Sequence, residues 1–229
     1  MIAQIELPVN ELARTDKAAC EQAALFELIA DSIERQGFVI LPDSLPESVA
    51  EALLECLSRV QSTAFQPATI GRGTDQMHNQ FVRRDNICWL EESTPYAASW
   101  FDWAGALQSY LNRRLFLGLF SFESHFSRYQ PGDFYRRHVD AFKGESNRVL
   151  SVVTYLNRGW EPDQGGELVL YPESASTDSI TVQPGFRTLV MFLSEEMPHE
   201  VLPTTRERFA VAGWFRINNS VQGNLDPPR

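Results

Sequence analysis

The chain has 229 residues, 43% of them hydrophobic, and is therefore long enough to bury a core within one domain, which we expect to span 1–229. Its formal net charge of −10 repels phosphate, and its Lys and Arg residues form no long run, so nucleic acid is excluded as an expected partner. Three scattered cysteines, no secretion signal at the start of the sequence and no apolar run near the roughly 20 residues that cross a bilayer predict a cytoplasmic protein without membrane contact.

The first half of the chain is predicted to be a mainly helical support over about 20–116. Apolar residues recur at helical spacing over 25–33, and Gly37 follows where a left-handed C-terminal cap belongs. A short strand is expected at 38–41. Ser44 and Pro46 are then predicted to be the N-cap and first-turn proline of a second helix that reaches about residue 60.

A polar and irregular segment over 71–92 interrupts this helical half. Its last part is apolar at 87–90, so we expect a mobile loop over 71–84 that runs into a strand. Helical spacing of apolar residues resumes over 100–115 and predicts a third helix.

After about residue 117 the spacing of apolar residues changes to the period of two that is typical of strands. The predicted strands cover 120–129, 135–138, 149–156, 167–171, 179–182, 188–193, 199–202 and 209–215. These strands favour a double-stranded β-helix, or jelly roll, over 117–217. Because the helices precede the strands rather than alternate with them, the expected class is mainly β, or α+β, with the N-terminal helices packed on one outer face.

One predicted strand carries a pair of residues suited to metal binding. His138 and Asp140 are two positions apart, so on a strand both side chains point to the same face. His199 is the only histidine further along the chain and is the candidate for a third ligand. Two His and one carboxylate leave three positions open on an octahedral metal, as expected for Fe(II) enzymes that bind a chelating cosubstrate and O₂. Structural zinc would instead be closed by four ligands.

An enzyme that uses 2-oxoglutarate also needs a cation for the far carboxylate of this cosubstrate. Arg208 follows His199 at the start of the last predicted strand, and its planar guanidinium can bind a carboxylate through two hydrogen bonds. Tyr129 and Tyr155 are candidates to add hydroxyl donors. Trp214 would share the face of Arg208 on the strand, and it is expected either in the core or beside the cosubstrate.

Simpler interpretations compete with this one. A His-x-Asp spacing often arises by chance, and it gains weight only from the His and Arg further along the chain. His78 and His125 have no partner at ligand spacing, so we expect neither to bind the metal. A β-barrel that binds a metal without catalysis, as a sensor or scaffold, is an alternative to an enzyme.

Several segments resemble the prolyl hydroxylases related to those that act on hypoxia-inducible factor. The sequence Tyr-Arg-Arg-His-Val-Asp at 135–140 is similar to the family's metal strand, and Thr-Tyr-Leu-Asn at 154–157 to its Tyr-Tyr-Leu-Asn strand. Gly-Gly-Glu-Leu at 165–168 is similar to the turn that follows. Pro-His-Glu-Val at 198–201 and the segment 208–214 resemble the strands of the distal His and the cosubstrate Arg. The resemblance runs from about residue 25 to residue 217.

This resemblance implies an Fe(II)- and 2-oxoglutarate-dependent dioxygenase that converts a prolyl residue to hydroxyproline with O₂, releasing succinate and CO₂, with ascorbate as a possible reductant. It implies that Tyr129 and Tyr155 hydrogen-bond the cosubstrate, that Arg208 pairs with its far carboxylate and that Trp214 packs nearby. Arg148 would lie at the substrate mouth. Oxygen sensing is a role associated with such enzymes.

The segment 84–89 is similar to the end of the family's mobile loop, which implies substrate contacts for Arg84 and Trp89. The chain resembles the pseudomonad type of these enzymes, which implies a proline of elongation factor Tu as the target and a monomeric enzyme. Ser151 departs from the pattern, because animal members carry Thr there. This departure makes the substrate less secure than the chemistry.

A second enzymatic alternative is a nucleic-acid demethylase of the same barrel class. Such an enzyme would show a basic groove and a second arginine six residues after the first. Position 214 is Trp, and the chain is acidic. Both observations favour the prolyl hydroxylase interpretation.

Overall fold

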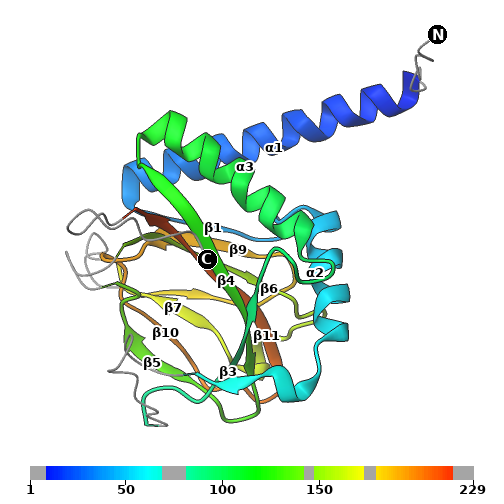
Figure 1. Ribbon diagram of the computed structural model, residues 1–229. Helices are drawn as coiled ribbons and strands as arrows, with labels where there is room; N and C mark the ends of the chain where they lie inside the picture. The colour runs from blue at the N-terminus through cyan, green and yellow to red at the C-terminus, as the bar shows by residue number, and fades with distance from the viewer. Residues whose placement is uncertain (1–8, 69–80, 142–146, 173–178, 219–229) are drawn as a thin grey trace.

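The structure, a computed structural model, describes residues 9–68, 81–141, 147–172 and 179–218 (Figure 1). Its three helices in this part are α1 (Val9–Gln36), α2 (Glu47–Arg59) and α3 (Ala98–Leu115). The strands are β1 (Phe38–Leu41), β2 (Gln66–Pro67), β3 (Asn86–Leu90), β4 (Leu119–Tyr129), β5 (Tyr135–His138), β6 (Arg148–Tyr155), β7 (Leu168–Leu170), β8 (Ile180–Val182), β9 (Leu189–Leu193), β10 (His199–Val201) and β11 (Arg208–Ile217). Short 3₁₀ turns cover Ser62–Ala64 and Pro162–Gln164.

The strands form two antiparallel sheets. The larger sheet has seven strands in the order β1-β9-β6-β11-β4-β3-β2, and the smaller has four in the order β5-β10-β7-β8. All eight strands predicted beyond residue 117 are present, each within two residues of the predicted bounds. The double-stranded β-helix is confirmed.

The hydrophobic core lies in two layers, one on each face of the seven-stranded sheet. Alternate residues of β11 supply both layers, since Val211 and Phe215 pack toward the helices while Ala210 packs toward the smaller sheet. Side chains of both sheets, such as Phe192 and Leu170, meet in the second layer. The metal-strand candidates therefore belong to the sheet that closes over this inner layer.

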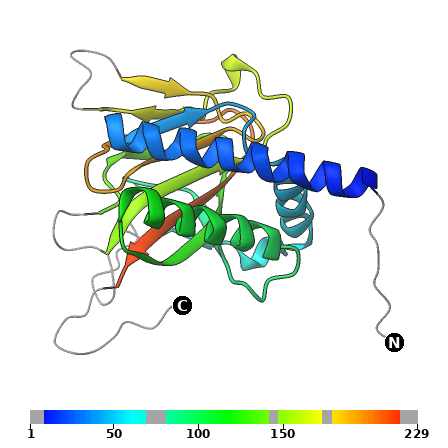
Figure 2. The ribbon, with the colours of Figure 1, turned by 90° about the horizontal axis from the view of Figure 1, so that it is seen from above.

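The helices cover only the outer face of the seven-stranded sheet, as predicted. Seen from above, α1 and α3 lie side by side across that face (Figure 2). Trp100, Leu107 and Leu53 are fully buried there. Burial of each such side chain contributes about 1.5–3 kcal/mol, so the helices stabilise the sheet that carries the site on its opposite face. None of the described helices is both long and apolar enough to cross a membrane.

Two predictions for the first half of the chain need correction. Ser44 is not the N-cap of α2, because Pro46 occupies that position and the Ser44 hydroxyl donates instead to the Pro42 carbonyl. The strands predicted at 38–41 and 87–90 are present as β1 and β3, but β2 was not predicted, and all three extend the seven-stranded sheet. Strand β2, which pairs with β3, has only two residues and is therefore too short for its sequence to show the period of a strand.

Candidate metal and cosubstrate site

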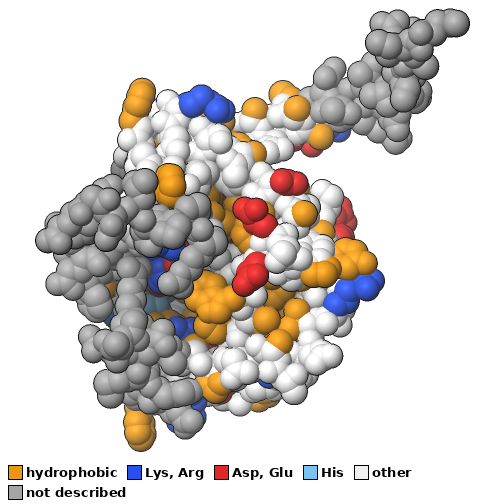
Figure 3. Space-filling model, viewed as in Figure 1, with side chains coloured by type: hydrophobic (Ala, Val, Ile, Leu, Met, Phe, Trp, Pro, Cys, Tyr) orange, Lys and Arg blue, Asp and Glu red, His pale blue; other side chains and the backbone are white. Residues whose placement is uncertain are grey.

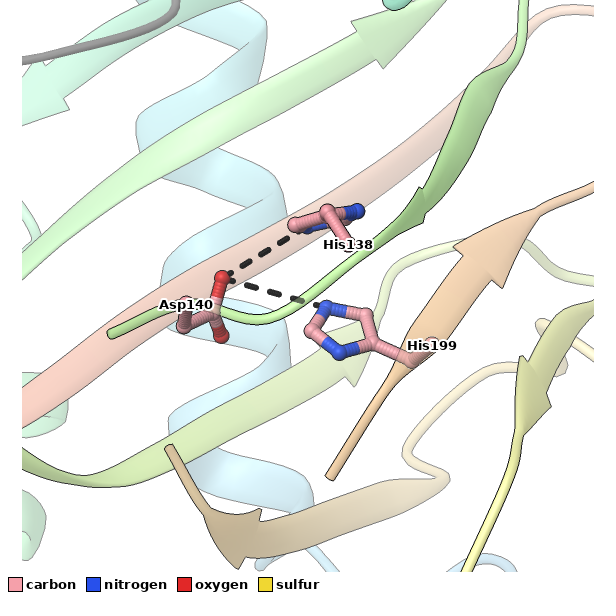
Figure 4. Close-up of side chains that lie close together, drawn as sticks. All are labelled: His138, Asp140 and His199. Atoms are coloured by element: carbon pink, nitrogen blue, oxygen red, sulfur yellow. Dashed lines mark ion pairs between the residues drawn. The ribbon is translucent and has the colours of Figure 1, made fainter. Parts of the chain in front are cut away.

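Strand pairing brings the three candidate ligands together. His138 ends β5, His199 begins β10, and the two residues are direct partners across the antiparallel ladder. Asp140 follows β5 by two residues, and its carboxylate points back toward both imidazoles (Figure 4). Two strands far apart in the sequence thus place all three side chains at one edge of the smaller sheet.

The geometry of these side chains suits a single metal ion. Oδ1 of Asp140 lies 3.6 Å from Nε2 of His138 and 3.8 Å from Nε2 of His199. The three ligand atoms lie within 4.8 Å of one another, and these residues are the only such cluster in the described part of the chain. The other ring nitrogens are engaged, because Nδ1 of His138 is 2.8 Å from the Arg136 carbonyl and Nδ1 of His199 is 2.9 Å from the Met197 carbonyl. Both Nε2 atoms therefore keep their lone pairs for a metal.

The protonation states of the cluster also suit metal binding. Burial, opposed by the Asp140 charge, lowers the pKa of His199 to about 4, so this imidazole is neutral near pH 7. Burial alone would raise the pKa of the Asp140 carboxyl, but the His199 and His138 rings and the Ser151 hydroxyl outweigh burial and hold this pKa below its ordinary value. A neutral imidazole and an ionised carboxylate are the forms that bind metals.

Arg208, the predicted cosubstrate cation, is buried on the inner face of the seven-stranded sheet with 2% of its surface exposed. Its Nε donates to the Gly166 carbonyl at 2.8 Å, and its guanidinium carbon lies 4.8 Å from the Tyr129 ring and 5.0 Å from the Tyr155 ring. No carboxylate among the described residues forms an ion pair with it. A buried cation of this kind needs an anion, and a dicarboxylate fits that need.

The Tyr155 hydroxyl supports the same interpretation. It is buried beside the Arg208 guanidinium, and no acceptor for its proton is found among the described residues. Burial raises the pKa of Tyr155 to about 12, so the hydroxyl stays protonated and can donate. An unsatisfied buried hydroxyl is costly, and a cosubstrate carboxylate oxygen would satisfy it.

Aromatic and basic side chains border the site on the inner face of the large sheet. The Arg148 guanidinium stacks over the Trp214 ring at 3.6 Å and pairs with Glu123 at 2.7 Å. The rings of His125, Trp214 and the half-exposed Trp89 contact one another, with His125 5.3 Å from Trp214 and 5.1 Å from Trp89. Figure 3 shows histidine and basic side chains close together in a recess of the molecular surface. Trp214 is buried and contacts Arg148 and His125, and its place beside the cosubstrate stays a prediction.

His125 does not join the metal cluster. Its Nδ1 lies 3.2 Å from the Ser127 hydroxyl and 3.2 Å from the Phe126 carbonyl. Burial, assisted by the nearby Arg83 charge, lowers the pKa of His125 to about 4. His78 and most of the predicted mobile loop lie outside the described residues.

The structure adds two residues that the sequence interpretation missed beside the metal cluster. Arg83 and Asp85 form an ion pair with contacts of 2.8 and 2.7 Å, and Asp85 is almost fully buried. The Arg83 guanidinium covers the Tyr135 ring at 4.3 Å, and that ring stacks on His138 at 3.5 Å. Arg84, the predicted substrate contact, is exposed, with its guanidinium 5.0 Å from the Phe134 ring. The spacing of two between Arg83 and Asp85 was the available signal, since such residues share a face of an extended chain.

Comparisons with known proteins agree with this geometry. The family description "2OG-Fe(II) oxygenase superfamily" matches residues 124–216. A solved Pseudomonas putida prolyl-4-hydroxylase is 36% identical with a TM-score of 0.74, and the match covers 85% of this chain and 100% of that one. A Trichoplax adhaerens prolyl hydroxylase, solved with a fragment of the hypoxia-inducible factor oxygen degradation domain, is 26% identical with a TM-score of 0.76, over 88% of this chain and 93% of that one. Human "Prolyl hydroxylase EGLN3" is 28% identical over 91% of this chain and 89% of its own length.

The chain therefore belongs to the 2OG-Fe(II) oxygenase superfamily. Within that superfamily it is of the prolyl hydroxylase type, which all three of these relatives represent. The family uses Fe(II), 2-oxoglutarate and O₂. The alternative of a non-catalytic metal-binding barrel is thereby set aside.

Proposed function

We propose that this protein is a prolyl 4-hydroxylase that acts on a protein substrate and holds Fe(II) through His138, Asp140 and His199. One observation carries the proposal: two imidazole Nε2 atoms and one carboxylate oxygen face a common point, while a buried arginine nearby has no carboxylate partner among the described residues. When bound, iron and 2-oxoglutarate supply the oxidation of a prolyl C–H bond by O₂, with succinate and CO₂ as coproducts.

The chain's own residues bind and orient the reactants. Arg208 would pair with the far carboxylate of 2-oxoglutarate while the Gly166 carbonyl fixes the angle of its guanidinium. Tyr155, with Tyr129 beside Arg208, would donate a hydroxyl hydrogen bond to the same carboxylate. These contacts would leave the keto acid end directed at the metal cluster.

The substrate would approach over the aromatic and basic border of the site. Arg148, Trp89 and Arg84 are the proposed substrate contacts, and Trp214 would form the wall between substrate and cosubstrate. In support, the Arg148 guanidinium is already held in place by Glu123 and the Trp214 ring. A rigid guanidinium at the mouth can donate hydrogen bonds to a backbone carbonyl or to an acidic side chain of a bound peptide.

The proposed partner is elongation factor Tu. The proposal rests on the resemblance to the pseudomonad enzymes and is supported by the 36% identity with a Pseudomonas putida prolyl-4-hydroxylase. With it we propose a cytoplasmic monomer with one catalytic domain over 1–229, and ascorbate as the reductant that keeps the iron divalent.

Ligand variants test the catalytic assignment. Asp140→Ala and His199→Ala should each abolish substrate-dependent succinate formation from 2-oxoglutarate, because two ligands cannot hold the metal in place. Asp43→Ala removes an exposed carboxylate between β1 and α2 and should leave the rate unchanged. Circular dichroism would verify that the folds match. Full activity of either ligand variant would refute the site.

Mass spectrometry tests the partner separately. Purified elongation factor Tu incubated with the enzyme, Fe(II), 2-oxoglutarate and O₂ should gain one oxygen atom on a proline, a mass increase of about 16. Replacement of that proline by Ala should remove the increase. If a prolyl peptide from another cytosolic protein is modified and elongation factor Tu is not, the chemistry stands and the partner is wrong.

A further inference from the structure

Two buried serines lie behind the Asp140 carboxylate. Ser151 on β6 is 1% exposed, and Ser194, directly after β9, is fully buried. The Ser151 Oγ lies 2.6 Å from Oδ2 of Asp140 and 2.9 Å from the Oγ of Ser194. The three groups form a continuous chain of hydrogen bonds in the interior of the protein.

The direction of this hydrogen-bond chain follows from the chemistry of its end. An ionised carboxylate only accepts hydrogen bonds, so the single hydroxyl proton of Ser151 is donated to Asp140. The second hydrogen bond of Ser151 must then be accepted from Ser194. Each hydroxyl therefore polarises the next, which strengthens the bond that reaches the carboxylate.

Ser194 also holds the backbone that carries Asp140. Its carbonyl accepts a hydrogen bond from the Ala141 amide at 3.2 Å, and its own amide donates to the Val149 carbonyl at 3.0 Å. The residue after Asp140 is thereby fastened to the ends of β9 and β6. Ser194 contacts the Asp140 segment at the carboxylate, through Ser151, and at the main chain.

We propose that Ser194 and Ser151 are positioning residues that act in series to set the rotation of the Asp140 carboxylate. The hydrogen bond from Ser151 directs Oδ2 away from the proposed metal position. Oδ1 is left facing the Nε2 atoms of His138 and His199, at 3.6 and 3.8 Å. An octahedral metal with three protein ligands has three positions for a chelating keto acid and O₂, and a carboxylate that bound through both oxygens would occupy one of them. This inference rests on the proposed metal site.

Metal affinity tests this Ser194–Ser151–Asp140 chain of hydrogen bonds, called the relay below, without relying on turnover. Calorimetry with Mn²⁺ should show about 10- to 100-fold weaker binding for Ser151→Ala, the usual effect of removing a group that orients a metal ligand. Ser194→Ala should weaken binding by a smaller factor, and Ser151→Thr, which keeps the hydroxyl, should bind within about twofold of the natural chain. Unchanged or tighter binding by Ser151→Ala would overturn the proposal.

The double variant separates a relay from two independent structural effects. If Ser194 acts through Ser151, the Ser151→Ala/Ser194→Ala protein should bind Mn²⁺ no more weakly than Ser151→Ala alone. Full additivity of the two losses would refute action in series. Ser124→Ala is the matched control. Ser124 lies on β4 of the same sheet, is also fully buried, and accepts a hydrogen bond from Trp100 of α3 at 3.0 Å. It should lower thermal stability and leave Mn²⁺ affinity unchanged.

Ligand variants in the same experiment distinguish failure of the relay from failure of the metal site. Asp140→Ala and His199→Ala should lose Mn²⁺ binding. If they bind Mn²⁺ like the natural chain, the metal site is wrong and the relay fails with it. If they lose binding while both serine variants keep it, the metal site stands and only the relay is overturned.

Discussion

The buried charge of Arg208 indicates which kind of ligand the site can bind. The Arg208 guanidinium is buried with 2% exposure, and the Gly166 carbonyl and two tyrosine rings that contact it among the described residues carry no negative charge to compensate it. A chain that keeps such a residue at the end of an inner sheet face provides a place for an anion. The buried Tyr155 hydroxyl, for whose proton the described residues offer no acceptor, adds a donor beside it.

Replacement of Arg208 should therefore act on the cosubstrate. Arg208→Lys keeps the charge but loses the planar fork, so the KM for 2-oxoglutarate should rise at least tenfold, as expected when a charge-assisted pair of hydrogen bonds is lost. Steady-state succinate formation over a range of 2-oxoglutarate concentrations measures this, with Mn²⁺ affinity as the control that should not change. An unaltered KM would place the cosubstrate elsewhere.

At the scale of elements, a glycine turn packs against Arg208, the residue proposed to bind the cosubstrate. Gly165 and Gly166, just before β7, have φ values of +67° and +72°, which residues other than glycine rarely adopt. A Cβ on Gly165 would lie 2.3 Å from the Pro203 carbonyl oxygen, and one on Gly166 would lie 3.0 Å from Cδ of Arg208. The turn thus packs directly against the segment that leads into β11.

Gly166→Ala should change both stability and cosubstrate binding. The positive φ costs about 1–2 kcal/mol of folding free energy for a residue with a Cβ, and the new methyl displaces Arg208. The KM for 2-oxoglutarate should rise several-fold.

Gly159→Ala is the matched control for this variant, because Gly159 has a φ of +58° and open space around its Cβ position. Chemical denaturation should show a similar loss of stability for both variants. An equal rise of KM in both would show that strain alone, not the contact with Arg208, is responsible.

On the scale of the whole molecule, the candidate site exists only when both sheets are in place. The metal cluster belongs to the smaller sheet and the loop after β5, while Arg208, Tyr155 and the orienting Ser151 belong to the larger. The helices on the outer face stabilise the larger sheet without contributing a candidate ligand. Global unfolding therefore dismantles metal and cosubstrate contacts together.

Acid should destabilise the metal-free protein. The pKa of the buried His125 is about 4 in the folded chain and near its ordinary 6.5 in the unfolded chain. Between these values the unfolded state binds more protons, so the free energy of unfolding falls as the pH falls from about 6.5 to about 4, by on the order of 3 kcal/mol from this group.

Urea denaturation at pH 7 and pH 4.5 in the presence of a chelator measures this loss. His125→Gln removes the titrating group and should lose less stability over the same interval, while the contribution of His199 is common to both proteins. An equal loss in the two proteins would contradict the role assigned to His125.

Local patterns anticipated much of the architecture. The period of two beyond residue 117 predicted the eight strands of the jelly roll, because alternation is a property of each strand by itself. It did not reveal β2, whose two residues are ordered only by pairing with β3. The sequence also failed to identify Pro46 as the N-cap of α2. Ser44 is not the cap because tertiary contacts set the backbone there: the amides of Ser44 and Leu45 both donate to the Arg187 carbonyl.

By itself, the sequence determined the bounds of most elements and the residue types that could form a metal and cosubstrate site. These depend on spacing along the chain, as the shared strand face of His138 and Asp140 shows. Only the tertiary structure decided that His199 pairs with His138, that Arg83 and Asp85 support Tyr135, and that Ser194 reaches Asp140 through Ser151. Such contacts depend on cross-strand register, which long-range burial of the two sheet faces sets and no local spacing records.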